Sequence, residues 1–263
     1  MPEHVELLHL VRAVAAIDGI ELRPDRDGVL PPGRAVSLIS WPQVRATLGS
    51  DDPLDPAPRR RLELLVELHQ VVGELGPDAA DRLGQASRAL ALPVGHPLHP
   101  GRGWVRHRLP GGVLDLGLGV AGLLPGRPGP VPLPPGVAEA AGLGGADRWE
   151  RLWQQAERLG ALAGRHLAGT GDSAVIRSAG GFDALTLAAT QALRDHLLGS
   201  TGPAGLPVAA PRRDRVLTGA RAGDRDRSRA TWLLSAAAER GVLEPLRLTG
   251  AGVEPVDLGA LRV

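Results

Sequence analysis

The sequence predicts a helix-rich α+β fold with a mostly antiparallel sheet that includes a hairpin at about 103–121. Apolar residues recur at helical spacing over long stretches, most regularly at 147–168. Shorter runs such as AVSLISW and SAVIR are typical of strands, and WVRHRLPGGVLDL places a glycine turn between two more. We expect a single domain over residues 1–263, with a possible boundary near residue 92 between a helical N-terminal part and a mixed C-terminal part.

The N-terminal third should be mostly helical. Residues 4–17 carry one apolar stripe, which predicts a helix. A strand is expected at 35–41, and Pro42 then suits the first turn of a short helix. Two more helices are expected at about 58–75 and 77–90.

The C-terminal half alternates helices with short strands. Asp147 and Glu150 have the spacing of a capping box at the start of a long helix. The expected elements are, in order, a helix over 147–168, a strand at 173–177, a helix capped by Asp183 and closed by Gly199, a possible strand at 206–210, a helix over 228–240 and a terminal pair of strands.

The missing residue types limit the chemistry that the chain can perform. It contains no Lys, Asn, Cys or Tyr, a bias typical of a genome with high G+C content. Without Lys, pyridoxal enzymes and P-loop NTPases are excluded. Without Cys, there can be no thiol nucleophile, thiolate zinc site or disulfide. Ser, Thr, His, Asp, Glu, Arg and the backbone remain.

Charge and hydropathy indicate neither a membrane nor a nucleic-acid partner. The net charge is +1, so no global field attracts a polyanion. The start, MPEHVELLHL, lacks the basic segment that precedes the apolar stretch of a signal peptide. The weakly polar run from Pro110 to Pro125 is too short to span a bilayer. We therefore expect a cytoplasmic protein.

The run VLDLGLGVAG (113–122) raises the question of a cofactor. VLDLGLG resembles the first motif of S-adenosylmethionine-dependent methyltransferases, and GLGVAG resembles the dinucleotide fingerprint of Rossmann folds. The resemblance implies a glycine loop that binds S-adenosylmethionine or a dinucleotide. It covers about ten residues of the 263.

The surrounding residues favour a hairpin strand over a cofactor loop. Leu114, Leu116 and Leu118 keep a spacing of two through the glycines, which predicts a half-buried strand that continues where a phosphate loop would turn. Pro125 follows soon after Gly122, so the helix that both families require is missing. We therefore expect no cofactor.

The loop and strand at 96–108 hold the densest cluster of chemically capable residues. The candidate ligand-binding residues are His96, His99, Arg102, Arg106 and His107. They could form an anion pocket, an enzyme site or a two- or three-histidine metal site. However, prolines interrupt the spacing, and no carboxylate lies nearby in the sequence to orient an imidazole. The alternative is a loop rimmed by histidines beside a strand with exposed arginines.

Three other segments have a functional and a structural interpretation. GDSAV (171–175) resembles the nucleophile block of GDS-type esterases, yet it lies mid-chain, which favours a turn role for Ser173. RSAGGFDALTL (177–187) could present backbone N–H groups to an anion, but Asp183 would place a negative charge there. The segment 211–229 holds seven Arg among three Asp and is interpreted as a solvated loop.

No acid–base pair or nucleophile arrangement emerges from these motifs. We therefore favour a non-catalytic interaction, assembly or regulatory protein, whose partner would be an unidentified protein or a second copy of the chain. Trp149 and Trp153, one helical turn apart, are the candidate interface residues, with core packing as the alternative. An enzyme or small-anion-binding module using the loop at 96–108 is the second hypothesis, and an S-adenosylmethionine- or dinucleotide-dependent enzyme through 113–122 is the third.

Overall fold

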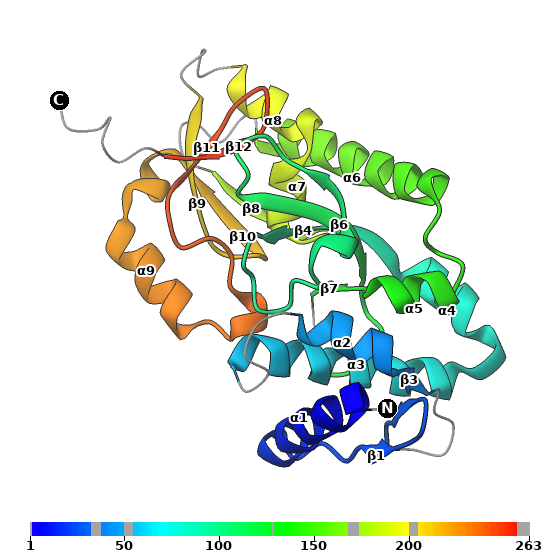
Figure 1. Ribbon diagram of the computed structural model, residues 1–263. Helices are drawn as coiled ribbons and strands as arrows, with labels where there is room; N and C mark the ends of the chain where they lie inside the picture. The colour runs from blue at the N-terminus through cyan, green and yellow to red at the C-terminus, as the bar shows by residue number, and fades with distance from the viewer. Residues whose placement is uncertain are drawn as a thin grey trace.

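The structure, a computed structural model, describes residues 2–32, 38–49, 55–127, 129–167, 174–199 and 205–256. The α+β prediction is confirmed: helix makes up 50% and strand 22%, and the three sheets are antiparallel. Figure 1 shows the N-terminal helices at one end and β9, β11 and β12 towards the other, with β4 and β6 near the middle of the molecule. No described helix is both long and apolar enough to cross a membrane.

The N-terminal part consists of helices with a small three-stranded sheet. Its elements are α1 (Pro2–Asp18), β1 (Arg23–Pro24), β2 (Gly28–Leu30), β3 (Ile39–Ser40), α2 (Trp41–Leu48), α3 (Pro56–Leu75) and α4 (Ala79–Ala86). The helices expected at 4–17 and 58–75 are therefore confirmed. Of the strand expected at 35–41, residues 35–37 lie outside the described residues, β3 covers only Ile39–Ser40, and Trp41 already begins α2. Ser40 caps α2 in a capping box with Gln43.

The helix expected at 77–90 is wrong beyond Ala86, because β4 (Ser87–Pro93) begins there. Alanine and leucine favour helix intrinsically. In β4, however, their alternation sends Ala89 and Ala91 to one hydrophobic cluster and Leu90 and Leu92 to another. Burial on both faces of the sheet thus overrides helix propensity.

The hairpin expected at about 103–121 is confirmed. Strand β5 (Val105–Arg108) pairs antiparallel with β6 (Leu114–Val120), whose other neighbours are β4 and β7 (Val131–Pro132). Gly111 and Gly112 make the turn with φ of 94° and 66°, values that only glycine adopts readily.

Gly117 of β6 leaves space for the side chain of Trp104, which agrees with the prediction of a strand. Gly117 lies under the indole of Trp104, and a Cβ on this glycine would overlap the ring. The Trp104 Nε1–H also donates to the Leu118 carbonyl at 2.6 Å. Because β6 runs extended from Leu114 to Val120, the chain does not turn at Gly117 as a phosphate loop would.

The C-terminal part adds the largest sheet and the long helix. Its elements are α5 (Pro135–Ala140), α6 (Ala146–Leu167), β8 (Val175–Arg177), α7 (Ala184–Ala189), α8 (Gln191–Leu198), β9 (Leu206–Arg212), β10 (Arg215–Thr218), α9 (Arg225–Leu234), β11 (Leu246–Leu248) and β12 (Val253–Pro255). The sheet order is β12-β11-β9-β10-β8. The helix expected over 228–240 ends already at Leu234.

Two hydrophobic clusters form most of the core. The first joins α1, α2 and α3 to the distal half of β6, and the second joins the proximal half of β6 to α7, β9 and β11. Trp149 and Leu152 of α6 pack against both clusters. The expectation of one domain, with a possible boundary near residue 92, stays a prediction; Leu92 itself lies within β4 and pairs with Asp115.

Candidate ligand pocket

Three segments that are far apart in the sequence enclose a pocket of about 780 Å³. They are the proline- and glycine-rich loop before β7, the strand and turn at 177–183, and the β9–β10 turn, closed on one side by the segment after α9. The charged residues that line it are Glu67, Arg127, Arg177, Asp183, Arg212, Arg213, Asp214, Arg215 and Glu239. A pocket of this size is in the range that holds small organic ligands.

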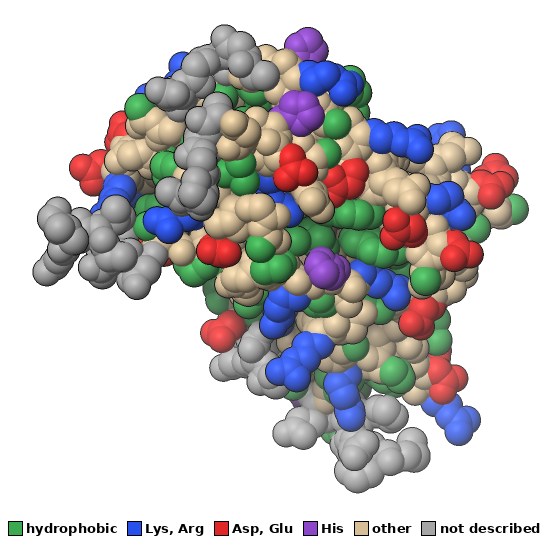
Figure 2. Space-filling model, turned by 90° about the horizontal axis from the view of Figure 1, so that it is seen from above, with side chains coloured by type: hydrophobic (Ala, Val, Ile, Leu, Met, Phe, Trp, Pro, Cys, Tyr) green, Lys and Arg blue, Asp and Glu red, His purple; other side chains and the backbone are tan. Residues whose placement is uncertain are grey.

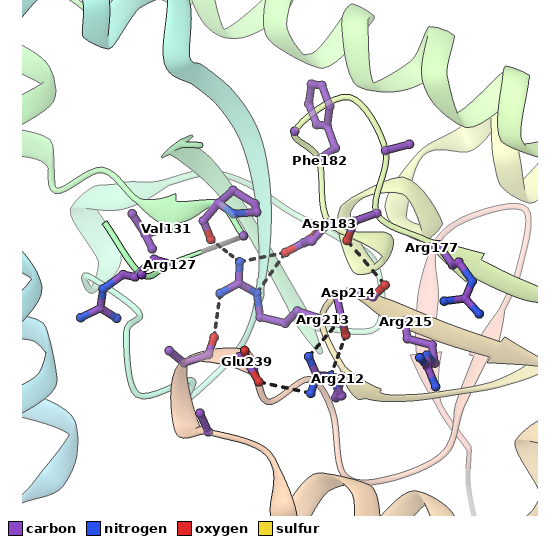
Figure 3. Close-up of a pocket in the computed structure, with 18 of the residues that line it drawn as sticks. Arg127, Val131, Arg177, Phe182, Asp183, Arg212, Arg213, Asp214, Arg215 and Glu239 are labelled. Atoms are coloured by element: carbon purple, nitrogen blue, oxygen red, sulfur yellow. Dashed lines mark hydrogen bonds and ion pairs between the residues drawn. The ribbon is translucent and has the colours of Figure 1, made fainter. Parts of the chain in front are cut away.

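A tight turn after β8 forms one wall of the pocket. Gly180 and Gly181 have φ of 59° and 81°, and they connect Ala179 to Phe182 across an antiparallel bridge. Positive φ at both central positions is the requirement of a two-residue hairpin turn. The Phe182 ring points away from the pocket arginines labelled in Figure 3, and Arg88, which does not line the pocket, lies over its other side at 5.9 Å from the ring centroid. The exposed edge of this turn is therefore backbone.

Arg213 is the buried centre of the pocket wall and is 5% exposed. Its guanidinium donates to Asp183 at 3.0 Å, to the Pro130 carbonyl at 2.6 Å and to the Ala238 carbonyl at 3.0 Å. These bonds join the three segments of the pocket (Figure 3). Arg213 therefore holds the pocket together and is not available to a ligand.

Asp183 has two roles in this arrangement. Its Oδ1 accepts from the Thr186 N–H at 2.7 Å, which confirms the expected cap of α7, and its Oδ2 accepts from Arg213. The negative charge that the sequence places at this turn is thus compensated by a buried guanidinium. A hydrogen-bonded pair of this kind is costly to break, because the remaining charge would be left in a poorly solvated site.

The other acidic residues of the pocket also have arginine partners. Arg127 forms two hydrogen bonds of 2.8 Å with Glu67, and this bonding raises the pKa of Arg127. Arg212 bonds Asp214 at 2.8 and 3.0 Å and lies 3.2 Å from Glu239. Burial acts to raise the pKa of Asp214, but the hydrogen bonds from Arg212 and the charges of Arg212 and Arg215 outweigh it, so this pKa is lowered.

Arg177 and Arg215 differ from the other pocket arginines. They are opposite each other in the β8–β10 pair, both are exposed, and both line the pocket. Within the described part of the chain, neither has an acidic partner, and Figure 3 shows both without a dashed contact. Like charges directly opposite on a sheet destabilise it. The pocket thus carries two guanidinium groups whose donors are free for an anion.

The residues expected to bind a ligand at 96–108 do not line this pocket. Arg102, Arg106 and His107 are exposed. His96 is buried, and its Nδ1 accepts from the Leu98 N–H at 3.1 Å. Burial, together with the charge of Arg213, lowers the pKa of His96 to about 3. A ligand-binding role for these five residues stays a prediction.

His99 corrects one inference from the sequence, because a carboxylate does orient its ring. His99 Nε2 lies 3.1 Å from Asp115 Oδ2, and Nδ1 accepts from the Gly101 N–H at 3.0 Å. Arg108 binds the same carboxylate through bonds of 2.6 and 2.8 Å, and these bonds lower the pKa of Asp115. Both ring nitrogens of His99 are therefore occupied. No group of three or more possible metal ligands occurs among the described residues.

Trp149 and Trp153 stack with ring centroids 6.0 Å apart and planes inclined by 17°. Both are partly buried and pack on the hydrophobic clusters. This packing gives them a structural role, and their interface role stays a prediction. Ser173 lies outside the described residues.

The sequence does not predict the pocket, because the segments that line it lie far apart in the chain and meet only after folding. The solvated loop expected at 211–229 instead contains the end of β9, all of β10 and the start of α9. The signal in the sequence is the short run Arg215-Val216-Leu217-Thr218, in which the β-branched residues Val216 and Thr218 favour a strand. Comparison with known proteins adds no constraint: the chain matches no protein-family model, no curated protein and no solved structure.

Proposed function

We propose that this protein binds a small organic anion in the arginine-lined pocket. The proposal keeps the small-anion module considered from the sequence but places it away from the loop at 96–108. Arg177 and Arg215 are the binding residues, and Arg213 positions the pocket walls.

The unpaired Arg177–Arg215 couple carries this proposal. Every other arginine of the pocket has a carboxylate partner, whereas these two face each other across β8 and β10. An anion between them would replace repulsion by charge-assisted hydrogen bonds, which contribute about 1.5–3 kcal/mol each. Gly180 and Gly181 are exposed and line the same pocket, and their N–H groups donate to no atom of the described residues.

Titration calorimetry with benzoate and phenyl phosphate tests the proposal. In the double variant Arg177→Gln/Arg215→Gln, we expect affinity for the bound probe to fall at least about tenfold. The matched control is Arg158→Gln/Arg165→Gln, which removes two exposed arginines of α6, outside the pocket, and should leave affinity unchanged. The proposal is wrong if neither probe binds at millimolar concentration, or if both double variants bind alike.

A second function, self-association through an exposed leucine pair, is favoured by one observation. Leu233 and Leu234 at the end of α9 are 57% and 88% exposed. Adjacent exposed apolar side chains form a patch, and exposed apolar patches can mark a protein-interaction surface. This would make the chain the assembly protein that the sequence favours.

Light scattering coupled to size-exclusion chromatography tests the second function. A dimer of the native chain that dissociates in Leu233→Ser/Leu234→Ser would support it. A monomer at all concentrations would contradict self-association. The result leaves the pocket proposal unaffected, because neither leucine lines the pocket.

A further inference from the structure

The charges and the apolar lining of the pocket restrict the class of anion. We infer that the ligand is a monocarboxylic acid with an apolar body, whose carboxylate lies between Arg177 and Arg215. This inference rests on the proposed function and adds the ligand class to it.

The first argument is the charge of the pocket. Five arginines and four carboxylates line it, which leaves one net positive charge. A singly charged ligand balances this excess, whereas a dianion would add a negative charge beyond it. Asp214 strengthens the point, because it directly precedes Arg215 and the nearby arginines lower its pKa, so it stays ionised. A dianion bound at Arg215 would therefore lie close to an ionised carboxylate.

The second argument is the geometry of the donors. Each guanidinium presents a planar fork that matches the two oxygens of a carboxylate. Arg177 and Arg215 extend from opposite positions of neighbouring strands, on the same face of the sheet. One carboxylate can thus accept from both forks.

The third argument is the remainder of the pocket, which a bare carboxylate would leave empty. A volume of about 780 Å³ exceeds what two or three atoms need. The neutral side chains that line it are mostly apolar, namely Pro125, Pro130, Val131, Ala179, Ala236 and Ala238. Burial of an apolar body against them would stabilise the complex, and acetate lacks such a body.

A matched set of four probes tests the ligand class by titration calorimetry. Benzoate, phenyl phosphate and methyl phenyl phosphate share a phenyl ring and differ in the acidic group, whereas acetate keeps the carboxylate without the ring. We expect benzoate to bind at least about tenfold more tightly than each of the other three. We also expect Arg177→Gln and Arg215→Gln each to weaken benzoate, with Arg158→Gln as the control.

The outcomes separate this inference from the proposed function. Tighter binding of phenyl phosphate or of the diester, lost in Arg177→Gln, would overturn the carboxylate class and leave the anion site standing. Equal affinity for acetate and benzoate would overturn the apolar body. Failure of all four probes to bind would overturn both proposals. Because Arg177 and Arg215 are exposed, the variants should fold, which circular dichroism can verify.

Discussion

At the scale of single residues, Arg213 and His96 are buried polar groups with large and different consequences. Arg213 is fully hydrogen-bonded, whereas His96 Nε2 has no partner among the described residues. The two are linked electrostatically, because the charge of Arg213 helps burial to lower the pKa of His96. The stability of the fold should therefore depend on the ion pair of Arg213 with Asp183 and on His96 remaining uncharged.

Arg213→Ala should lower the free energy of unfolding by about 3–5 kcal/mol, because it leaves the Asp183 carboxylate buried without its partner. Urea unfolding measures the change. Arg177→Ala, in the same pocket but exposed, should change stability by less than about 0.5 kcal/mol. A loss below about 1 kcal/mol for Arg213→Ala would show that the pair contributes little.

Acid should destabilise the protein through His96. Its pKa falls from 6.5 to about 3 on folding, so the unfolded chain binds a proton that the folded chain does not. The stability contributed by His96 is complete above the higher value and is lost as pH falls from 6.5 towards 3, by up to about 1.4 kcal/mol per pH unit.

Urea unfolding between pH 8 and pH 4 measures this dependence. His96→Leu should flatten the slope below pH 6.5, whereas His107→Leu, at an exposed histidine, should leave it unchanged. An unaltered slope in His96→Leu would assign the acid sensitivity to other groups.

At the scale of elements, the packing around β6 accounts for its two glycines. Periodicity alone predicted this strand, since the leucines alternate through Gly117 and Gly119. The structure adds that Leu90 packs against Gly119 as Trp104 packs against Gly117. Gly117 and Gly119, the first two glycines of the run that resembles a cofactor motif, are therefore a packing requirement of the sheet.

Gly117→Ala should destabilise the protein by about 1–3 kcal/mol, because the added methyl group overlaps the indole of Trp104. Gly145→Ala is the control, since a Cβ there meets nothing within 4 Å. Denaturant midpoints of the two variants give the comparison. Equal stability of Gly117→Ala and the native chain would mean that Trp104 can move away at no cost.

The local sequence pattern predicts the long helices and β6 correctly, but it predicts neither β4 nor the pocket. The helix over 147–168 and the strand through Leu114–Leu118 have one period that persists, so each could be read within a single window. Strand β4 was not predicted, because alanine and leucine favour helix intrinsically. They form a strand here because both faces of the strand are buried. The pocket could not be predicted from local pattern, because Arg213 contacts Asp183 and Pro130 only in the folded chain. These partners are 30 and 83 residues away from it in the sequence.

At the scale of the whole molecule, α6 connects the two hydrophobic clusters. Trp149 and Leu152 pack against both, and β6 contributes Leu118 to one and Leu116 to the other. Shared side chains of this kind couple the folding of neighbouring parts. The chain should therefore unfold in one transition, and Trp41, buried in the first cluster, is its local probe.

The fluorescence change of Trp41, taken as the difference between the native chain and Trp41→Phe, should occur at the same denaturant concentration as the change in far-ultraviolet circular dichroism. Adding Leu152→Ala, which removes contacts with both clusters, should lower both midpoints together. If Trp41 instead reports unfolding well before the dichroism changes, the first cluster is an independent unit, and the single-domain prediction is wrong. β6 is one continuous strand that contributes side chains to both clusters. We therefore expect the two transitions to coincide.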